Sequence, residues 1–459
     1  MKKTYIIDTN VLIQSPHALN SFEDNDIVLP ISVLEELDKH KNADGEKGAN
    51  TRSVIRSLDK LRLSGKLTDG VKLDSGGTLR LQLNCAHIEL PDTWDSASPD
   101  NRILKICKHL VNEGKHAIIV TNDIILRIKA DSIGLQAEEF TTDRSPEIEK
   151  QYKGRLIVWV QDAELDNFAK THQLSPDNTY VLAENCDEPY AKVTPCYIEN
   201  QFITLVSDAN PQKTMLGKYQ NGAIVPLYYA GHRPFGIKPR NTGQKFVQEA
   251  LMDNSVPLVI VKGPAGTAKT FYSLAVGLSK VMESDIKEYR KILVCRPGAE
   301  FDDNIGFLPG DEQQKINPLL RPIRDNLEIL VDGNEEQRYE DEQLLSNKVE
   351  ELFDREIVTA QALNFIRGRS IIKTWLIIDE AQNLTPKQAK GIITRAGKHT
   401  KIVLVGDPAQ IDNHLLDERT NGLSFASEKM KGSKLCYQIT MDNNECERSA
   451  LAMDAANRM

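Results

Sequence analysis

A glycine-rich stretch in the second half of the 459-residue chain has the residue types and spacing of a phosphate-binding loop. The apolar run Leu258–Val261 leads into Gly263-Pro264-Ala265-Gly266-Thr267-Ala268-Lys269-Thr270, and a helical pattern follows. Such a strand, loop and helix point successive backbone N–H groups at one place, which suits a phosphate. Lys269 would reach the β- and γ-phosphate oxygens, and the Thr270 hydroxyl would bind Mg²⁺. The stretch therefore predicts an ATP site, with a chance glycine-rich turn as the alternative.

One position of this loop departs from the usual pattern, because Ala268 stands where a second glycine is common. Alanine fits if the position has ordinary helical dihedral angles, but its methyl group narrows the approach of the phosphate. The alanine therefore bears on nucleotide affinity rather than on the kind of ligand.

Two later strand ends carry polar residues that suit hydrolysis of the γ-phosphate. Asp379 and Glu380 follow the apolar run Trp375–Ile378. Asp379 would hold the Mg²⁺, and Glu380 would orient or deprotonate the attacking water. Gln410 follows the run Ile402–Val405, where it could sense the γ-phosphate.

An amide upstream of the loop, Gln244, completes the predicted ATP site. A carboxamide donates and accepts hydrogen bonds at once, so Gln244 could read the edge of an adenine. Taken singly, Gln244 and Gln410 are more often surface amides, but their order along the chain favours the functional interpretation.

This half of the chain carries several further motifs: Arg296-Pro297, Gly306–Asp311, Phe365–Arg369, Asp379–Leu384 and Gly406–Asp412. Through these motifs it resembles the PhoH family, ATPases related to the first core domain of superfamily 1 helicases, from about Pro239 to the C-terminus. The resemblance implies a RecA-like P-loop fold that binds and hydrolyses ATP with Mg²⁺.

The length of the chain predicts an oligomer. Helicases of that superfamily close the ATP site with an arginine from a second core domain, and the roughly fifty residues after Gln410 leave no room for one. The arginine would then come from another subunit, so we expect a closed homo-oligomer, in the form of a hexameric ring. Arg395 and Arg448 are the candidates, and solvated helix residues are the alternative interpretation of both.

Acidic residues near the N-terminus form a second candidate site. Asp8 ends the first predicted strand, Tyr5–Ile7, and Asp123 follows the strand Ala117–Val120. Asp100 opens a helix after Ser98 and Pro99. An acid at the end of a buried strand is costly unless it is paired or bound to a metal.

A fourth acid comes from the helix that begins near Pro30. Ser32 and Glu35 have the spacing of a capping box, which leaves Glu36 free for the site and Glu35 as an alternative. A cluster of Asp8, Glu36, Asp100 and Asp123 without Cys or His selects Mg²⁺ or Mn²⁺ over zinc. Such metals activate water against a phosphodiester. The competing interpretation is that these acids are helix caps and turn formers.

As a set, these residues have a resemblance of their own. Asp8-Thr9-Asn10, Glu36, Asp100 and Thr121-Asn122-Asp123 resemble the PIN domain over roughly residues 3–142. The PIN domain is a metal-dependent nuclease fold that acts mostly on single-stranded RNA. A PIN domain joined to a PhoH domain is a known arrangement, so each resemblance supports the other.

The order of strands and helices predicts an α/β protein of three domains. A parallel-sheet PIN-like domain would span 1–145, a β-rich connector 146–236 and a RecA-like ATPase domain 237–459. The connector is expected from strand-like runs at Leu156–Val160, Tyr180–Leu182 and Phe202–Val206, separated by turns rich in Asp, Asn and Pro. Further parallel strands are expected at Ile27–Leu29 and Ile292–Val294.

Composition excludes several classes of protein. No apolar run approaches the ~18 residues of a membrane span, and the N-terminal segment fails as a secretory signal, so a cytoplasmic protein is expected. Seven scattered cysteines without a Cys-x-x-Cys pair disfavour a disulfide framework and a zinc site, and indicate reduced, mostly buried thiols. The net charge of -9 means that any binding of nucleic acid rests on local basic patches.

The sequence thus predicts an ATP-driven RNA-processing enzyme that acts on single-stranded RNA, in which an ATPase pulls or unwinds RNA and a PIN-like domain cuts it. Two alternatives remain: a PIN-like domain that binds RNA without cutting it, and a signalling NTPase that has no polynucleotide substrate. Candidates for gripping the strand by phosphate contact and stacking, with surface salt bridging as the alternative, are Arg296, Phe365, Arg367, Arg369 and Lys373.

Overall fold

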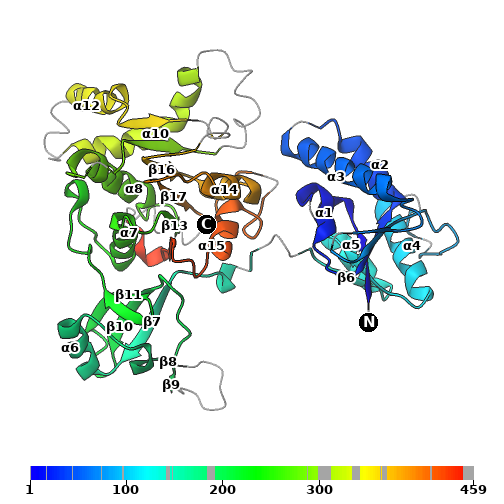
Figure 1. The fold of residues 1–459 in the computed structure, drawn as a ribbon, viewed down its shortest axis with the longest axis horizontal. Helices are drawn as coiled ribbons and strands as arrows, with labels where there is room; N and C mark the ends of the chain where they lie inside the picture. The colour runs from blue at the N-terminus through cyan, green and yellow to red at the C-terminus, as the bar shows by residue number, and fades with distance from the viewer. Residues whose placement is uncertain are drawn as a thin grey trace. The chain divides into compact units, whose positions relative to one another are not determined.

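The chain folds into two compact units, Met1–Arg144 and Ser145–Met459. In the computed structural model, drawn in Figure 1 with its colour running from blue at the N-terminus to red at the C-terminus, each unit contains its own sheets. The structure describes residues 2–16, 18–43, 45–73, 75–91, 93–95, 98–140, 145–146, 148–182, 192–286, 288–297, 312–332, 342–361, 363, 370–413 and 416–447.

The N-terminal unit is a six-stranded sheet with helices on both faces. Its strand order is β3-β4-β2-β1-β5-β6, and all neighbours are parallel except β3 and β4. One apolar cluster joins α1, α2 and α3 to the sheet, and a second joins α4 and α5 to the opposite face. The elements are β1 (Lys3–Ile7), α1 (Thr9–Gln14), η1 (Ala18–Asn20), β2 (Asp26–Pro30), α2 (Ile31–His40), α3 (Gly45–Ser64), β3 (Val71–Lys72), β4 (Thr78–Gln82), α4 (Pro99–Asn112), β5 (His116–Val120), α5 (Ile124–Ser132) and β6 (Gln136–Glu138).

The second unit begins with the connector, a six-stranded sheet of order β12-β11-β10-β7-β8-β9. Its pairs are antiparallel except β7 with β10, and helix α6 packs on one face through a small apolar cluster. The elements are η2 (Ile148–Lys150), β7 (Arg155–Val160), α6 (Asp162–Thr171), η3 (Pro176–Asn178), β8 (Thr179–Leu182), β9 (Lys192–Val193), β10 (Phe202–Ser207), β11 (Thr214–Gln220) and β12 (Ala223–Pro226).

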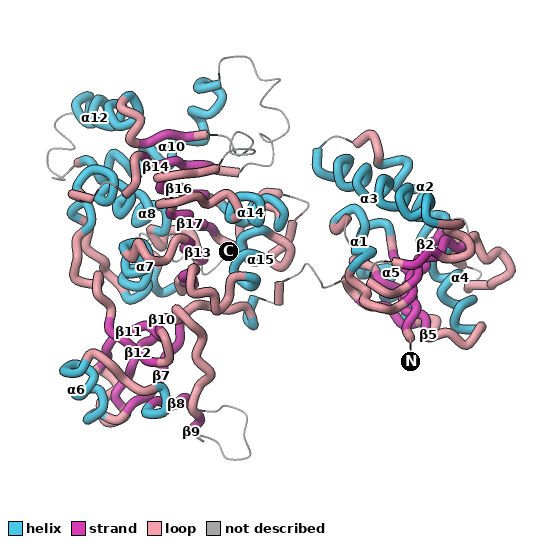
Figure 2. Tube along the Cα trace, viewed as in Figure 1, coloured by secondary structure: helices cyan, strands magenta, loops and turns pink. Residues whose placement is uncertain are grey.

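The rest of the second unit is a parallel six-stranded sheet of order β15-β14-β16-β17-β13-β18. Helices α7, α8, α10 and α12 share one apolar cluster with this sheet, and α14 and α15 share another, so both faces are covered (Figure 2). The elements are η4 (Pro234–Gly236), α7 (Thr242–Met252), β13 (Leu258–Lys262), α8 (Lys269–Leu278), the π-helical turn η5 (Ser279–Glu283), β14 (Lys291–Cys295), α10 (Glu312–Val331), α12 (Glu342–Asp354), β15 (Val358–Ala360), β16 (Thr374–Ile378), η6 (Ala381–Asn383), α14 (Pro386–Ile393), β17 (Lys401–Gly406), α15 (Gly422–Lys429), β18 (Cys436–Thr440) and η7 (Asn443–Glu445).

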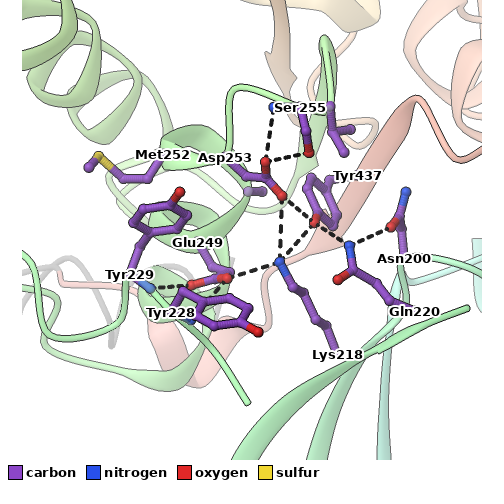
Figure 3. A network of polar contacts seen from close by, with 12 residues as sticks. Asn200, Lys218, Gln220, Tyr228, Tyr229, Glu249, Met252, Asp253, Ser255 and Tyr437 are labelled. Atoms are coloured by element: carbon purple, nitrogen blue, oxygen red, sulfur yellow. Dashed lines mark hydrogen bonds and ion pairs between the residues drawn. The ribbon is translucent and has the colours of Figure 1, made fainter. Parts of the chain in front are cut away.

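A buried polar network joins the connector to the parallel sheet and its helices (Figure 3). The Nζ of Lys218 in β11 lies 3.0 Å from Glu249 Oε1 in α7 and donates to the Tyr437 hydroxyl in β18 at 3.0 Å. Lys218 is only 2% exposed and Glu249 is 0% exposed. A buried charge is tolerated when it is paired and hydrogen-bonded, so this network fixes the connector to α7 and β18.

The α/β class and the parallel sheets at both ends are confirmed, and every strand predicted from an apolar run lies within an observed strand. Of the cysteines in the described residues, six are free thiols and four of these are buried. Among the described residues, no helix is long and apolar enough to cross a membrane.

Candidate active sites

The phosphate-binding loop joins β13 to α8, as the sequence predicts. The Nζ of Lys269 donates to the carbonyl oxygens of Gly263 and Pro264 at 2.6 and 2.7 Å and to the Thr267 hydroxyl at 3.2 Å. Burial lowers the pKa of Lys269, an effect opposed by the nearby Asp407, Glu380 and Asp379. The ammonium group of Lys269 thus donates to oxygen atoms of the loop itself. A bound phosphate would replace these hydrogen-bond acceptors.

Ala268 does not have the ordinary helical dihedral angles with which an alanine would fit this position. Ala268 has φ 62° and ψ 27°, the left-handed conformation, directly before the first residue of α8. A residue with a Cβ is strained there, which explains why glycine is the common choice at this position. The loop keeps its shape because Gly263 and Gly266 supply the other two positive φ angles.

The magnesium-binding pair predicted from two distant segments comes together in the structure. The Thr270 hydroxyl donates to Asp379 Oδ1 at 2.7 Å, because β13 and β16 flank β17 in the parallel sheet and both segments leave its carboxyl edge. Asp379 is 6% exposed, and burial is the main cause that raises its pKa. A Mg²⁺ ion delivered with ATP would offset that cost.

Glu380 is held on both carboxylate oxygens. Arg296 Nη2 lies 3.2 Å from one, and Gln382 Nε2 donates to the other at 2.6 Å. The same Gln382 donates to Gln410 O at 2.7 Å and accepts from the Asp407 N–H at 3.1 Å. Gln382 therefore ties the candidate base to the turn that carries Gln410. The sequence analysis gave Gln382 no role, although it follows the acidic pair by two residues.

Gln244 is buried, with an exposed fraction of 1%. Its Oε1 accepts from the Arg240 N–H at 2.8 Å and from the Tyr272 hydroxyl at 3.1 Å, and its Nε2 donates to Glu447 Oε1 at 2.7 Å. Since Glu447 can only accept, the orientation of the amide is fixed. The side chain of Gln410 is exposed instead.

Only some of the other candidate residues in this half, those for the ATP-site arginine and for RNA contact, lie in the described part of the chain. Arg395 follows α14, is partly buried and contacts the carbonyl oxygen of Gly391 through Nη1. Lys373 has a positive φ of 51° just before β16. Arg448, Phe365, Arg367, Arg369 and the motif at 306–311 lie outside the described residues.

In the N-terminal unit, Asp8 sits where the sequence places it, after β1 and before α1. It is 4% exposed and accepts a hydrogen bond from the Thr121 hydroxyl at 2.7 Å. Burial raises the pKa of Asp8 to about 6, and the nearby acids Asp100 and Glu36 add to the rise.

The capping box expected at the start of α2 was wrong. Helix α2 begins at Ile31 with Pro30 as the N-cap and no side-chain cap, and the hydroxyl of Ser32 is buried without a hydrogen-bond partner. Glu35 forms an ion pair with Arg102 at 2.9 Å, whereas Glu36 accepts from the Thr9 hydroxyl, beside Asp8.

Asp100 and Asp123 also lie near this group. Burial raises the pKa of Asp100, with Asp123 and Glu36 contributing and Lys129 opposing. Asp123 caps α5 by accepting from the Ile125 N–H at 2.7 Å, so the helix-cap interpretation is correct for this residue. Ser98 is the N-cap of α4 without a side-chain hydrogen bond.

The donor set of these acids is suited to a hard divalent cation. All four offer carboxylate oxygens, and the neighbouring acids add to the raised pKa of Asp8 and of Asp100. Mg²⁺ and Mn²⁺ prefer such ligands. As the described side chains stand, no three Asp, Glu, His or Cys residues are close enough to enclose a metal, so a bound ion would draw the carboxylates together.

Two family models match the chain, one in each half. Residues 236–459 match the family model described as PhoH-like protein, and residues 5–141 match the model described as PIN domain. Protein PhoH2 of Bacillus subtilis (strain 168) is 36% identical over 466 residues, which covers 100% of both chains. The chain belongs to the PhoH2 family.

Other relatives match either nearly the whole chain or only about half of it. Protein PhoH2 of Mycolicibacterium smegmatis is 32% identical and covers 98% of this chain and 95% of its own. A PhoH-like protein of Bacillus subtilis is 34% identical, but it aligns with only 47% of this chain and 61% of its own. The resemblances to the PhoH family and the PIN domain are therefore confirmed.

Proposed function

We propose that this PhoH2-family protein is an ATP-dependent RNA-processing enzyme. The ATPase domain hydrolyses ATP and pulls or unwinds RNA, and the PIN domain cuts the RNA with Mg²⁺ or Mn²⁺. The observation that carries the first half is the meeting of Thr270 and Asp379 at 2.7 Å beside Lys269. The second half is supported by the burial of Asp8 and by the neighbouring acids that add to the raised pKa of Asp8 and Asp100.

The chain's own residues have distinct tasks in ATP hydrolysis. Lys269 exchanges its carbonyl partners for phosphate oxygens, Thr270 and Asp379 hold the metal, and Glu380 takes the proton of the attacking water. Because Gln382 links Glu380 to the turn before Gln410, the position of the base is tied to the segment next to the γ-phosphate. Mg²⁺ neutralises charge that develops on the phosphates.

In the PIN domain the acids would bind metal and direct water at the phosphodiester. Asp8 is the central ligand, since it is the most buried of the four and Thr121 fixes one of its oxygens. Glu36, Asp100 and Asp123 would be the further ligands. The metal supplies an activated water at neutral pH.

One experiment tests both halves in the full-length protein. ATPase and RNA cleavage are measured with and without unstructured single-stranded RNA, for the wild type, Lys269→Ala and Asp8→Asn. We expect Lys269→Ala to lose ATP hydrolysis and still cut RNA, and Asp8→Asn to lose cleavage and still hydrolyse ATP. Near-normal ATPase activity in Lys269→Ala would falsify the loop assignment.

The same experiment separates the alternatives. A PIN domain that binds RNA without metal-dependent cleavage is the binding-module alternative. An ATPase that RNA does not stimulate indicates a signalling NTPase instead. Replacing the RNA by single-stranded DNA of the same sequence then defines the substrate class.

A further inference from the structure

The connector lies between the two regions that match family models, yet it packs within the same compact unit as the ATPase domain. We propose that the connector positions the nucleotide site: Arg155 in β7, acting through Glu445, holds the start of α7 and the segment behind the phosphate-binding loop. Arg155 and Glu445 are then positioning residues. This inference rests on the ATPase activity proposed above.

Glu445 is the centre of the arrangement and is 6% exposed. Its Oε1 accepts from the Gly243 N–H in the first turn of α7 at 2.7 Å. Its Oε2 accepts from Arg155 Nη1 at 2.7 Å and from the Asp442 N–H at 3.0 Å. A carboxylate at a helix N-terminus is favoured by the helix dipole. A Cβ on Gly243 would lie 2.5 Å from this carboxylate, so glycine is needed for the contact.

Arg155 supplies the positive charge that this buried carboxylate requires. The guanidinium group also lies 3.1 Å from Asp442 Oδ2, and its central carbon lies 5.9 Å from the centre of the Phe246 ring in α7. Breaking a buried ion pair on one side leaves the other charge uncompensated. Without Arg155, Glu445 has to move toward water or take up a proton.

The connector backbone is fitted to β18 so that Arg155 reaches this place. Gly154 has a φ of +73°, and a Cβ there would lie 1.8 Å from the carbonyl oxygen of Gln438. One residue earlier, the carbonyl oxygen of Lys153 accepts from the Thr440 N–H at 2.8 Å. Only glycine allows this approach, so the position of Arg155 relative to β18 is set by the backbone.

From Glu445 the chain runs directly along the phosphate-binding loop. The Cys446 thiol donates to the Ala265 carbonyl oxygen at 3.6 Å, and the Glu447 N–H donates to the Gly266 carbonyl oxygen at 2.9 Å. The Glu447 carboxylate accepts from Gln244. Residues 445–447 therefore join the start of α7 to the loop, and a displacement of Glu445 moves both walls of the nucleotide site.

The connector holds the other end of α7 as well. Lys218 contacts Glu249 at 3.0 Å and Asp253 at 3.5 Å, and the Tyr437 hydroxyl donates to Asp253 at 2.8 Å (Figure 3). Helix α7 is thus fixed near both ends by side chains of one connector sheet. A helix held at two points transmits a shift at either end to Gln244.

The test compares substitutions in the full-length protein by ATPase kinetics and by titration with a fluorescent ATP analogue. Arg155→Met should raise the KM for ATP and weaken analogue binding by about tenfold, a typical size for coupled contacts, with little change in kcat. Arg155→Lys should recover part of the loss. The matched control is Lys213→Met, which breaks the connector's exposed ion pairs with Asp162 and Asp166 and should leave both values at wild type.

A double substitution tests whether the two residues act together. Glu445→Gln keeps an acceptor for Gly243 but removes the charge, so Arg155→Met with Glu445→Gln should bind ATP no worse than Arg155→Met alone. Wild-type analogue affinity in a folded Arg155→Met protein, or additive losses in the double variant, would overturn the proposal. If Arg155→Met does not fold, Glu445→Gln alone decides by the same titration. Absent ATPase activity in the wild type with normal analogue binding would reject the proposed function and leave this test intact.

Discussion

Asp8 and Asp379 lie in separate sheets, but their surroundings are alike. Each carboxylate follows a parallel strand, is almost fully buried and accepts a hydrogen bond from a threonine hydroxyl at 2.7 Å. Burial raises the pKa of both. A buried carboxylate with a raised pKa is unfavourable when it is charged. A bound divalent cation would therefore stabilise the charged form of both Asp8 and Asp379.

The pKa of Asp8 predicts a dependence on pH. The pKa is about 6 in the folded protein against an ordinary value of 3.8, so the folded state binds this proton more tightly than the unfolded state. Protonation of Asp8 therefore stabilises the folded state below pH 3.8. As the pH rises toward 6 this stabilisation is lost, and the free energy of unfolding falls by about 3 kcal/mol. Metal-free Asp8→Asn should be more stable than the wild type above pH 6, and the difference should vanish near pH 4.

Thermal unfolding across this pH range, without metal, measures that difference between the two proteins. Adding Mn²⁺ should then stabilise the wild type increasingly above pH 6, because the metal displaces the proton, and should stabilise Asp8→Asn little. An equal effect of Mn²⁺ on both proteins would show that Asp8 is not a ligand.

Glu380 allows a second prediction about a single side chain. Glu380→Gln keeps the side-chain volume and an acceptor for Gln382, but it cannot take a proton. We expect kcat to fall by about 100-fold or more, the usual contribution of a general base, while ATP binding stays within a few-fold of wild type. Single-turnover hydrolysis and equilibrium nucleotide binding test the two parts separately, and unchanged hydrolysis would assign the base elsewhere.

At the level of elements, buried apolar runs predicted strands reliably, whereas the hydrogen-bond partners of single side chains were predicted only in part. Buried runs such as Leu258–Val261 are strands in the structure, because a parallel sheet buries both faces of each strand. The capping box at Ser32 failed, since Glu35 pairs with Arg102, a residue 67 positions away. The pairing of Arg155 with Glu445, 290 positions apart, leaves no local signal at all.

The backbone conformation of the turn between β13 and α8 was likewise not predictable from the sequence. Residue type alone does not give the dihedral angles of Ala268, because they depend on how the loop joins the strand to the helix. Ala268→Gly should raise the unfolding free energy by up to about 1 kcal/mol by removing the left-handed strain, and it should also ease the approach of the phosphate.

A residue in the connector, far along the chain from the phosphate-binding loop, has the same left-handed backbone conformation and serves as the control. His172 ends α6 in the left-handed conformation with a φ of 56°. His172→Gly should stabilise the protein to a similar degree and leave ATP affinity unchanged. Ala268→Gly should tighten ATP binding as well. If Ala268→Gly lowered both stability and affinity, the alanine methyl group would have a packing role that outweighs the strain.

At the scale of the whole molecule, the proposed ATP site still needs an arginine that stabilises the charge on the γ-phosphate. The elements of the ATP site, from the loop to Gln410, come from a single core domain, and Arg296 is engaged by Glu380. An arginine supplied from the far side is worth about 10³-fold or more in rate. A closed ring would place one such arginine at each interface, so ATPase activity per subunit should fall on dilution.

Mixing two inactive proteins tests this arrangement. Lys269→Ala keeps its arginines, and Arg395→Ala or Arg448→Ala keeps its phosphate-binding loop. Lys269→Ala should be inactive alone, and so should whichever of the two arginine variants removes the arginine that completes the neighbouring site. In a mixture, an interface that pairs an intact loop with an intact arginine should regain activity, up to about a quarter of the wild-type rate for random pairing of equal amounts. Recovery with only one of the two arginine variants identifies the residue. A monomeric mass by light scattering, full activity at high dilution and no recovery on mixing would show that one chain completes its own site.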